Sequence, residues 1–301
     1  MIMNVLAIDI GGTKVKFGTV SHSGKITRSA QFAVERGAKP ESVISRIAFR
    51  LKEERFGKFS GIGIACAGLM AASGRTVVFS PNLNWRNIPL AGIAEKILGR
   101  PARIENDVNA VALGEQKFGA GKGADDLVAL FVGTGIGGGI VSGGRLIRGA
   151  NGFSAEIGHT VFKPDGWRCA CGRRGCFETY AGGKYIVCNF HRSGGSRSLK
   201  KPSDIYAAAK KGNRIARRVW QDALEALSTL CVNLATTLDT KVIVLGGGVI
   251  ENCPGLDREI MRKVRRYFTR NWKNCPAIVK SSLGADAALL GAASCAIDAL
   301  T

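Results

Sequence analysis

The densest group of side chains able to do chemistry lies between residues 156 and 178. Cys169, Cys171 and Cys176 fall within eight residues, glycines mark the turns around them, and His159 lies ten residues before the first cysteine. Three thiolates and one imidazole form the ligand set of a closed zinc site, which leaves no position open for a substrate. A disulfide is the alternative, and an expected intracellular location disfavours it. The spacing therefore predicts a structural Cys₃His zinc site.

Two glycine-rich segments, residues 9–14 (DIGGTK) and 133–139 (GTGIGGG), are candidates for phosphate binding. Glycine lets the backbone approach a phosphate with its N–H groups pointing inward, and a threonine hydroxyl adds a donor. Neither segment has the P-loop or dinucleotide-binding pattern, because hairpin strands rather than a helix are expected after each. Two such turns after equivalent strands, with a third glycine turn at residues 245–249 (LGGGV), predict the binding of nucleotide phosphates.

Asp107 is the candidate for proton transfer. It lies within residues 105–110 (ENDVNA), where a buried strand is expected to become a helix. One interpretation makes Asp107 only the residue that caps the helix N-terminus, a position that aspartate favours. The other interpretation is sugar recognition, in which Asn106 pairs with a hydroxyl and Asp107 accepts its proton. Phosphoryl transfer needs a residue of that kind to orient the nucleophile.

Alternating strands and helices must position these groups. Apolar periodicity predicts helices near residues 40–56, 91–98, 182–191, 203–211, 213–238, 255–270 and 284–299, and one beginning at Asp107. Strands are expected at residues 4–10, 61–68, 102–105, 127–133, 242–249 and 277–280, and a polar loop around residues 80–82. A strand, a glycine turn and two further strands occur at residues 5–33 and again at 127–148, which indicates a weak internal duplication and a two-lobed α/β protein.

The charge of the chain is unusually positive. Its 301 residues have a formal net charge of +20, with nine Lys and Arg against one acid in residues 192–218 and seven against two in residues 256–275. Both stretches have helical periodicity, where such charge is usually a solvated face. A general affinity for polyanions is compatible with this charge, whereas recognition of a specific nucleic acid is not expected. No helix-turn-helix segment precedes residue 5. The chain also has no run of apolar residues long enough to span a membrane and no secretory signal, so we expect a cytoplasmic protein without a membrane partner.

In order along the chain, the segments DIGGTK, ENDVNAVALGE, GTGIGGG, EIGH, CACGRRGCFET and LGGGV resemble the ROK family (repressors, open reading frames, kinases). The resemblance spans residues 4–298 and is greatest to the ROK glucokinases in the sugar-kinase branch. It implies the actin-like ATPase (ribonuclease H-like) α/β fold, with two lobes around a cleft. The smaller lobe would comprise residues 1–117 and 286–301. The larger lobe, which carries the zinc-binding loop, would comprise residues 118–285.

The same resemblance implies roles for individual residues. Asp107 would be the general base on the sugar 6-hydroxyl, and His159 would serve both the sugar and the zinc. The sugar would contact Gly68, Asn82, Asn106, Asp107, Glu156, His159 and Glu178. ATP and Mg²⁺ would contact Asp9, Gly11, Gly12, Thr13, Lys14, Thr134, Gly135, Gly247 and Gly248. The structural zinc would be held by His159, Cys169, Cys171 and Cys176.

The implied activity is ATP-dependent phosphorylation of glucose in glycolysis, by a homodimer. Glu156 favours a glucose-like sugar, because a histidine can stand there in bacterial-type N-acetylmannosamine kinases. A kinase for an N-acetylhexosamine (N-acetylmannosamine or N-acetylglucosamine) or for fructose is an alternative, as is a non-catalytic sugar sensor. Polyphosphate is an alternative donor, although polyphosphate glucokinases of the family generally lack the cysteine cluster. The chain departs from the family near the sugar pocket, with Cys66-Ala67-Gly68 where Pro-Gly is frequent and Gly182 in place of a serine.

Overall fold

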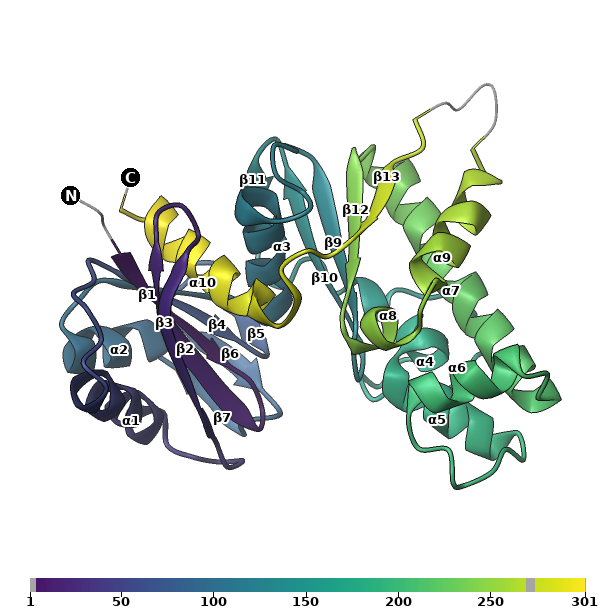
Figure 1. Cartoon of the computed structure of the whole chain (residues 1–301), viewed down its shortest axis with the longest axis horizontal. Coiled ribbons are helices and arrows are strands. Elements are labelled where there is room, and N and C mark those ends of the chain that lie inside the picture. Colours follow the sequence, from purple (N-terminus) through teal and green to yellow (C-terminus); the bar gives the residue numbers. More distant parts are fainter. Residues whose placement is uncertain (1–3, 269–273, 301) are drawn as a thin grey trace. The chain divides into compact units, whose positions relative to one another are not determined.

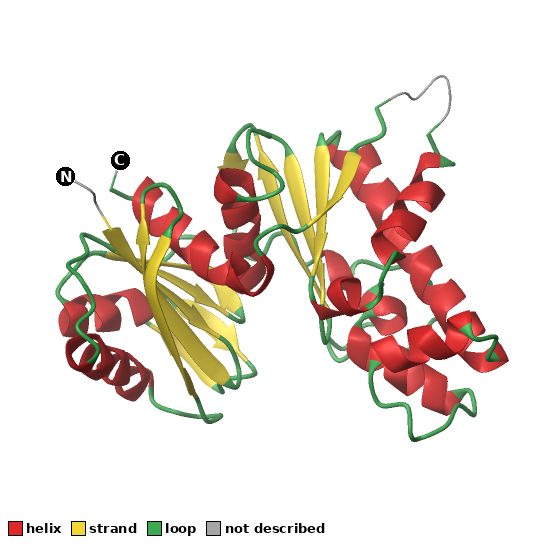
Figure 2. Cartoon of the chain, viewed as in Figure 1, coloured by secondary structure: helices red, strands yellow, loops and turns green. Residues whose placement is uncertain are grey.

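A computed structural model describes residues 4–268 and 274–300, and its chain divides into two compact units. Unit 1 comprises Met1–Gly123, Arg145–Ser154 and Ser282–Thr301, and unit 2 comprises Ala124–Gly144 and Ala155–Ser281. Each unit contains a sheet packed against helices (Figures 1 and 2), which confirms the expected α/β class. Within the described part of the chain, no helix combines the length and the apolar character needed to cross a membrane.

Unit 1 is built on a sheet with the strand order β3-β2-β1-β4-β8. The strands are β1 (Asn4–Ile10), β2 (Lys14–Ser21), β3 (Ile26–Ala33), β4 (Ile62–Cys66) and β8 (Ala102–Asn106). β1, β4 and β8 are parallel, whereas β2 and β3 extend the sheet by antiparallel pairing. The expected hairpin after the first glycine turn is thereby confirmed.

The central strand β1 is buried on both faces. Leu6, Ile8 and Ile10 belong to one hydrophobic cluster, and Val5 and Ala7 belong to another. Successive residues of a strand point to opposite faces of the sheet, so the two clusters lie on the two sides of β1. The middle of a strand in this position is apolar on both faces instead of alternating with polar residues, as residues 5–8 of β1 are.

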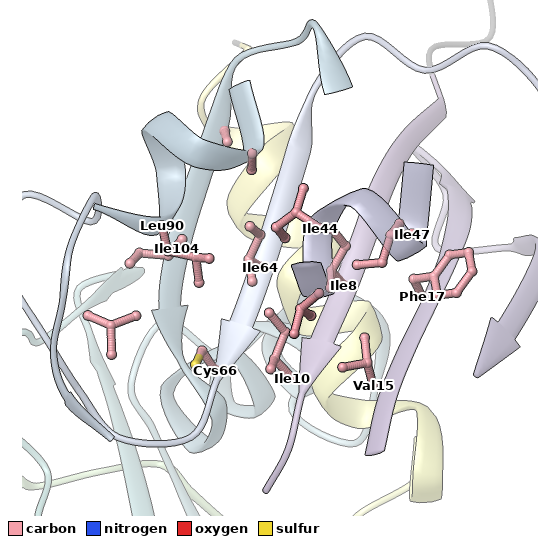
Figure 3. Packing of buried hydrophobic residues seen from close by; sticks show 14 of the residues in the cluster. Ile8, Ile10, Val15, Phe17, Ile44, Ile47, Ile64, Cys66, Leu90 and Ile104 are labelled. Carbon is pink, nitrogen blue, oxygen red and sulfur yellow. The ribbon is translucent and has the colours of Figure 1, made fainter. Parts of the chain in front are cut away.

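Helices cover both faces of the unit 1 sheet. α1 (Pro40–Glu53) and α2 (Leu90–Leu98) pack on the face that carries Ile8 and Ile10 (Figure 3). α3 (Asp107–Phe118) and α10 (Ala287–Asp298) pack on the opposite face. The last helix of the chain therefore belongs to the same unit as the first strand.

A small sheet that the sequence did not predict lies beside the expected polar loop. It consists of β5 (Leu69–Met70), β6 (Val77–Ser80) and β7 (Trp85–Ile88), paired in the order β5-β6-β7. Strands of two and four residues are too short to show a periodic pattern of apolar residues. The loop itself, residues 81–84, connects β6 to β7 as a turn.

Unit 2 contains a second hairpin in which a strand, a glycine turn and an antiparallel strand follow one another. β9 (Leu127–Val132) pairs antiparallel with β10 (Ile136–Ser142) and parallel with β12 (Val242–Gly246), which pairs parallel with β13 (Ala277–Lys280). The two-residue strand β11 (Arg145–Leu146), which follows β10 in the sequence, belongs to the chain segment assigned to unit 1. The hairpin expected after the second glycine-rich segment is thus confirmed as well.

Four helices of unit 2 lie close to their expected positions, whereas three short ones, at residues 157–159, 178–181 and 248–252, were not predicted. In chain order, these helices are η1 (Ile157–His159), α4 (Glu178–Ala181), α5 (Gly183–Arg192), α6 (Pro202–Lys210), α7 (Arg214–Leu238), α8 (Gly248–Asn252) and α9 (Leu256–Arg265), and the turn η2 (Gly284–Asp286) precedes α10 in unit 1. Two expectations need correction. The strand expected to reach residue 249 ends at Gly246, because α8 begins two residues later. The helix expected at 255–270 ends at Arg265, and part of that range lies outside the described residues.

Helix α10 approaches its neighbours at backbone distance because glycines lie at the contacts. A Cβ atom at Gly63 in β4 would lie 1.7 Å from the carbonyl oxygen of Ala292. A Cβ atom at Gly291 would lie 1.8 Å from the carbonyl oxygen of Ala110 in α3. Both positions therefore exclude any side chain unless a backbone segment moves.

We expect Gly63→Ala to lower the free energy of unfolding by about 1–3 kcal/mol, because the added methyl group overpacks the contact between β4 and α10. Urea denaturation of the two proteins measures the difference. Gly92→Ala is the matched control, since a methyl group at that position would have no neighbouring atom within 4 Å and alanine favours a helix interior by about 0.5–1 kcal/mol. Equal losses in both variants would contradict this account of the packing.

Candidate functional site

In unit 1, the carboxyl ends of three parallel strands bring the predicted catalytic residues to one edge of the sheet. Ile10 of β1 pairs with Cys66 of β4, and Cys66 pairs with Asn106 of β8. Asp9 and Asp107 adjoin the outer two of these positions. Side chains at the carboxyl ends of parallel strands meet at the same edge, which is the usual location of a ligand site in such sheets. Figure 3 shows Cys66 beside Ile10 at the end of the buried cluster.

Asn106, and not Asp107, caps helix α3. The Asn106 Oδ1 atom accepts hydrogen bonds from the backbone N–H groups of Val108 (2.9 Å) and Asn109 (3.0 Å). Its Nδ2 atom donates to the carbonyl oxygen of Gly68 (2.9 Å). Asp107 is therefore the first residue of the helix, and the interpretation of Asp107 as only an N-cap is wrong.

Two glycines bring the loops of this edge into close contact. At Gly68, where φ is +131°, a Cβ atom would lie 2.4 Å from the carbonyl oxygen of Phe79. At Gly12, a Cβ atom would lie 2.8 Å from the Cβ atom of Asn82. The predicted phosphate-binding turn and the loop that follows β6 therefore pack directly on each other. Gly12 and Asn82, assigned separately from the sequence, are neighbours.

The two carboxylates of this edge are costly to ionise. Burial, and then the negative charge of Asp107, raise the pKa of Asp9 to about 6, although Lys14 and Lys16 act in the opposite direction. Burial also raises the pKa of Asp107, against hydrogen bonds to its ionised form from backbone N–H groups and the Asn106 side chain. Carboxylates with raised pKa values are better proton acceptors than exposed ones, as a general base requires.

Cys66 lies between these carboxylates without the properties of a nucleophile. Its side chain is fully buried. Burial, with the charges of Asp107 and Asp9, raises the pKa of its thiol well above the ordinary range. The thiolate is the reactive form of cysteine, so Cys66 serves as a small core residue at this edge.

The sequence did not indicate that Glu105 and Arg148 support this edge of the sheet. Glu105 is 3% exposed and accepts hydrogen bonds from the Asn106 backbone (3.0 Å), the Asn109 side chain (3.1 Å) and Arg148 Nε (2.8 Å). The last contact is an ion pair with a residue 43 positions away. Glu105 thus anchors the first turn of α3 from inside the unit, and Arg148 balances its buried charge. Sequence spacing contains no signal for so distant a pairing.

In unit 2, the second glycine-rich turn is held in place by α5 and by Glu178. The backbone N–H groups of Gly183 and Lys184, in the first turn of α5, donate to the carbonyl oxygens of Gly133 (2.9 Å) and Thr134 (3.0 Å). The Glu178 Oε2 atom accepts from the backbone N–H of Ile136 (2.9 Å) and would lie 2.2 Å from a Cβ atom at Gly135. Glycine at position 135 is therefore needed to admit the Glu178 carboxylate.

The third glycine turn lies against the same strand end. At Gly247, where φ is +86°, a Cβ atom would lie 2.6 Å from the carbonyl oxygen of Val132. Gly246 also pairs with Phe131 across the parallel strands β12 and β9. The turns at residues 133–135 and 246–248, each predicted to contact nucleotide, are consequently neighbours within unit 2.

The predicted metal ligands form one cluster. The Nδ1 or Nε2 atom of His159 and the Sγ atoms of Cys169, Cys171 and Cys176 all lie within 4.8 Å of one another. Sγ atoms of Cys171 and Cys176 are 3.6 Å apart, and Cys169 Sγ is 3.6 Å from His159 Nδ1. Burial, and then the neighbouring thiols, raise the pKa of Cys176 to about 12. This crowding of ionisable sulfurs is characteristic of a metal centre.

His159 connects this cluster to Glu156. Its Nδ1 atom faces Cys169, while its Nε2 atom lies 4.0 Å from Glu156 Oε2. The short η1 turn that carries His159 packs so tightly on β10 that a Cβ atom at Gly158 would lie 2.3 Å from the carbonyl oxygen of Ile136. The two ring nitrogens thus point to two different groups of predicted site residues.

The predicted sugar-binding residues are distributed over both units. Gly68, Asn82, Asn106 and Asp107 belong to unit 1, and Glu156, His159 and Glu178 belong to unit 2. The predicted nucleotide-binding residues divide in the same way, with residues 9–14 in unit 1 and the turns at residues 133–135 and 246–248 in unit 2. Each unit therefore contributes one coherent group of side chains and glycine turns.

Comparisons with known proteins agree over nearly the whole chain. The model of the ROK family matches residues 5–299. A glucokinase from Thermotoga maritima is 35% identical, covering 97% of this chain and 96% of the relative. An N-acetylmannosamine kinase from Citrobacter koseri is 31% identical, covering 97% and 98%. The crystal structure of a ROK family glucokinase from Streptomyces griseus in complex with glucose and AMPPNP matches with a TM-score of 0.82 and 32% identity, covering 98% and 99%.

We expect the titration of Asp9 to destabilise the folded protein as pH rises. Its pKa is about 6 in the folded chain against an ordinary value of 3.8, so the folded state binds this proton more tightly and the free energy of unfolding falls between these two pH values. Asp9→Asn removes the effect and should raise the free energy of unfolding at pH 7 by on the order of 2 kcal/mol. Urea denaturation across this pH range measures the difference.

Asp165→Asn is the control for this experiment, because Asp165 is exposed. Its pH profile should follow that of the unchanged protein. A profile of Asp9→Asn that also follows the unchanged protein would contradict the assignment of a raised pKa to Asp9.

Proposed function

The chain belongs to the ROK family, and from this premise we propose that it is an ATP-dependent sugar kinase that phosphorylates the 6-hydroxyl of a hexose, with glucose as its substrate. The proposal rests on the position of the Asp107 carboxylate and on its raised pKa. The carboxylate lies at the carboxyl edge of the unit 1 sheet with a raised pKa, and Asn106 supplies the cap of α3 in its place. The glucokinase relatives, similar over nearly their full length, support the choice of reaction and substrate.

In the proposed mechanism, Asp107 accepts the proton of the hexose 6-hydroxyl as that oxygen attacks the γ-phosphorus of ATP in line. The new bond joins the sugar oxygen to phosphorus, and the bond from phosphorus to the bridging oxygen of ADP breaks. The products are hexose 6-phosphate and ADP, and the proton remains on Asp107 until it exchanges with solvent. Backbone N–H groups of the glycine turns stabilise the charge of the phosphoryl group.

The sugar-binding residues are those that the family implies. In the proposal, Asn82, Asn106 and the backbone at Gly68 contact the sugar, as do Glu156, His159 and Glu178. Most of these groups have at least one interaction with the surrounding protein, such as the hydrogen bond from the Ile136 N–H to Glu178. Side chains fixed in this way lose little freedom when a ligand binds.

The nucleotide is held by the glycine turns. Asp9, Gly11, Gly12, Thr13 and Lys14 contact the phosphates, as do Thr134 and Gly135, while Gly247 and Gly248 lie near the adenosine. Mg²⁺ bound with ATP would neutralise phosphate charge during transfer. A divalent cation near Asp9 would also favour the ionised form of that carboxylate, which burial and Asp107 oppose in its absence.

The cysteine cluster fits a structural zinc ion. Zinc bound to thiolates at about 2.3 Å in a tetrahedron separates the sulfurs by about 3.8 Å, and the Cys171 and Cys176 Sγ atoms are 3.6 Å apart. Three thiolates and the His159 imidazole complete the four ligands. The ion would order the segment that carries Glu156, His159 and Glu178, so it would act on sugar binding through these residues.

Phosphorylation of an N-acetylhexosamine is the second candidate function, favoured by the N-acetylmannosamine kinase relative. Glu156 argues for glucose because a histidine can occupy its position in bacterial-type kinases for N-acetylmannosamine. From the family we further propose a cytoplasmic homodimer that acts in glycolysis. We also retain the proposed lobes, residues 1–117 with 286–301 and residues 118–285.

An ADP-release assay over glucose, mannose, fructose, allose, N-acetylglucosamine and N-acetylmannosamine tests the function. The highest kcat/KM is expected with glucose and ATP. A preference for an N-acetylated sugar would select the second candidate, and binding of sugar without turnover would select a sensor. Because polyphosphate releases no ADP, formation of sugar phosphate is measured with that donor, and a rate equal to or faster than that with ATP would overturn the donor.

Asp107→Asn should lower kcat at least about 10³-fold while glucose still binds, because the amide preserves shape but cannot accept the proton. ADP release measures kcat, and calorimetry measures the dissociation constant for glucose. An Asp107→Asn enzyme with substantial activity would refute the assignment of the general base. Loss of glucose binding together with activity would instead make Asp107 a binding residue.

Cys169→Ser should remove zinc and weaken glucose binding about tenfold or more, because the segment at residues 153–178 loses its cross-link. Elemental analysis measures zinc, and calorimetry measures glucose affinity. Cys188→Ser is the matched control, since Cys188 is a free cysteine outside the cluster. Absence of zinc from the unchanged protein, purified without chelator, would contradict the proposed metal centre.

A further inference from the structure

One stretch of unit 2 carries charge that neither catalysis nor the metal centre uses. Residues 192–218 contain nine Lys and Arg and one acidic residue, a formal net charge of +8 within a chain of +20. All nine basic side chains are exposed. The stretch runs from the end of α5 through α6 into the first turns of α7 (Figure 1). So large a local excess of positive charge is expected either on a surface that only water and counterions contact or on a surface that binds a polyanion.

Few of these cations have partners within the protein. Lys210 forms an ion pair with Glu259, and the Arg192 guanidinium lies 4.3 Å from the centre of the Trp167 ring. Throughout residues 4–268 and 274–300, no acidic side chain forms an ion pair with the other seven, which are Arg197, Lys200, Lys201, Lys211, Arg214, Arg217 and Arg218. Their charge is therefore available to an external ligand.

Four of the seven lie together where α6 ends and α7 begins. Arg214, Arg217 and Arg218 have the i, i+3, i+4 spacing that places side chains on one face of a helix. Arg217 Nε donates to the carbonyl oxygen of Ala209 (3.2 Å), so this face of α7 adjoins the end of α6, which Lys211 follows directly. We call Lys211, Arg214, Arg217 and Arg218 the α6–α7 basic cluster.

The arrangement does not serve the stability of the helix. α7 has no acidic residue in its first turn and begins with Arg214. The positive end of a helix dipole favours acidic side chains and disfavours basic ones. Positive charge in the first turn of α7 therefore lowers the stability of this helix, and it raises the positive potential of the surface. Both consequences favour an anionic ligand over a purely solvated face.

The composition around the cluster indicates which polyanion fits. Within the described residues, the large exposed hydrophobic side chains are Phe49, Phe153, Val161, Trp167, Tyr267 and Leu300. None falls in residues 192–218, and the ring of Trp167 is covered by Arg192. A membrane-binding surface needs apolar groups that enter the lipid, and a protein interface needs an apolar core. A phosphate backbone needs neither, because it is bound by charge and N–H donors alone.

We propose that the α6–α7 basic cluster binds the phosphate backbone of nucleic acid without reading its sequence. This inference goes beyond the kinase activity and does not depend on it. Arginine is suited to the role, since its planar guanidinium can donate two parallel hydrogen bonds to one phosphate. Because the cluster would contact phosphates and not bases, its affinity for nucleic acid should depend on salt and on strand charge but only weakly on base sequence.

The test is fluorescence anisotropy of the whole protein with a labelled 20-nucleotide single-stranded RNA and a 20-base-pair DNA duplex. Lys211→Glu, Arg214→Glu and Arg218→Glu are combined in one variant. It should fold because all three side chains are exposed and because Arg214→Glu places a favoured acidic residue in the first turn of α7. We expect affinity for RNA to fall at least tenfold. The slope of log K against log salt should also become shallower by about 2, since each lost contact to a single strand contributes about 0.7.

The matched control reverses three exposed lysines outside the cluster, Lys25→Glu, Lys58→Glu and Lys96→Glu, which changes the net charge by the same amount. This variant should lose less than threefold in affinity, and both variants should keep hexose kinase activity. Equal losses in the two variants would reduce the effect to net charge and overturn the proposed surface. Binding to anionic phospholipid vesicles but not to RNA or DNA would overturn the proposed ligand. Comparable binding of RNA and duplex supports backbone recognition.

Discussion

The side-chain amide of Asn106 joins three parts of the catalytic edge. Its oxygen caps α3, and its nitrogen holds the carbonyl of Gly68, so the end of β8, the start of the helix and the bend after β4 are fixed together. The neighbouring carboxylate of Asp107 also accepts from the Val108 N–H (3.0 Å), but the residue that caps the helix is Asn106. Asn and Asp both favour the N-cap position. The proposed chemistry depends on Asn106 being the cap of α3 and Asp107 being the proton acceptor.

The same edge illustrates how a catalytic arrangement reduces stability. Asp9 and Asp107 are both carboxylates whose pKa values burial raises, and the negative charge of Asp107 further disfavours the ionised form of Asp9. The buried Glu105 adds a third carboxylate, which is balanced by Arg148 and two further hydrogen bonds. Glu105, which supports the helix, is therefore surrounded by an ion pair and hydrogen bonds, whereas the charges of Asp9 and Asp107 are only partly compensated.

Both units use glycine to let a polar side chain approach a turn. In unit 1, Asn82 occupies the space that a Cβ atom at Gly12 would need, and in unit 2 the Glu178 carboxylate does the same at Gly135. Glycine-rich turns are usually explained by the approach of a ligand phosphate. Here the protein's own side chains also occupy the space that Cβ atoms would fill. These two positions must therefore be glycine even before a ligand binds.

Local periodicity and spacing were sufficient to predict the α/β class, the two glycine hairpins, most helices and the clustering of His159 with three cysteines. They gave no indication of β5, β6 and β7, whose two to four residues carry no periodic signal. The capping of α3 by Asn106 became apparent only from the folded chain, because the carbonyl of Gly68, 38 positions away, holds the Asn106 amide. The pairing of Glu105 with Arg148 was likewise decided by the fold. Contacts between residues far apart in the chain arise from packing, which no local pattern of residue types encodes.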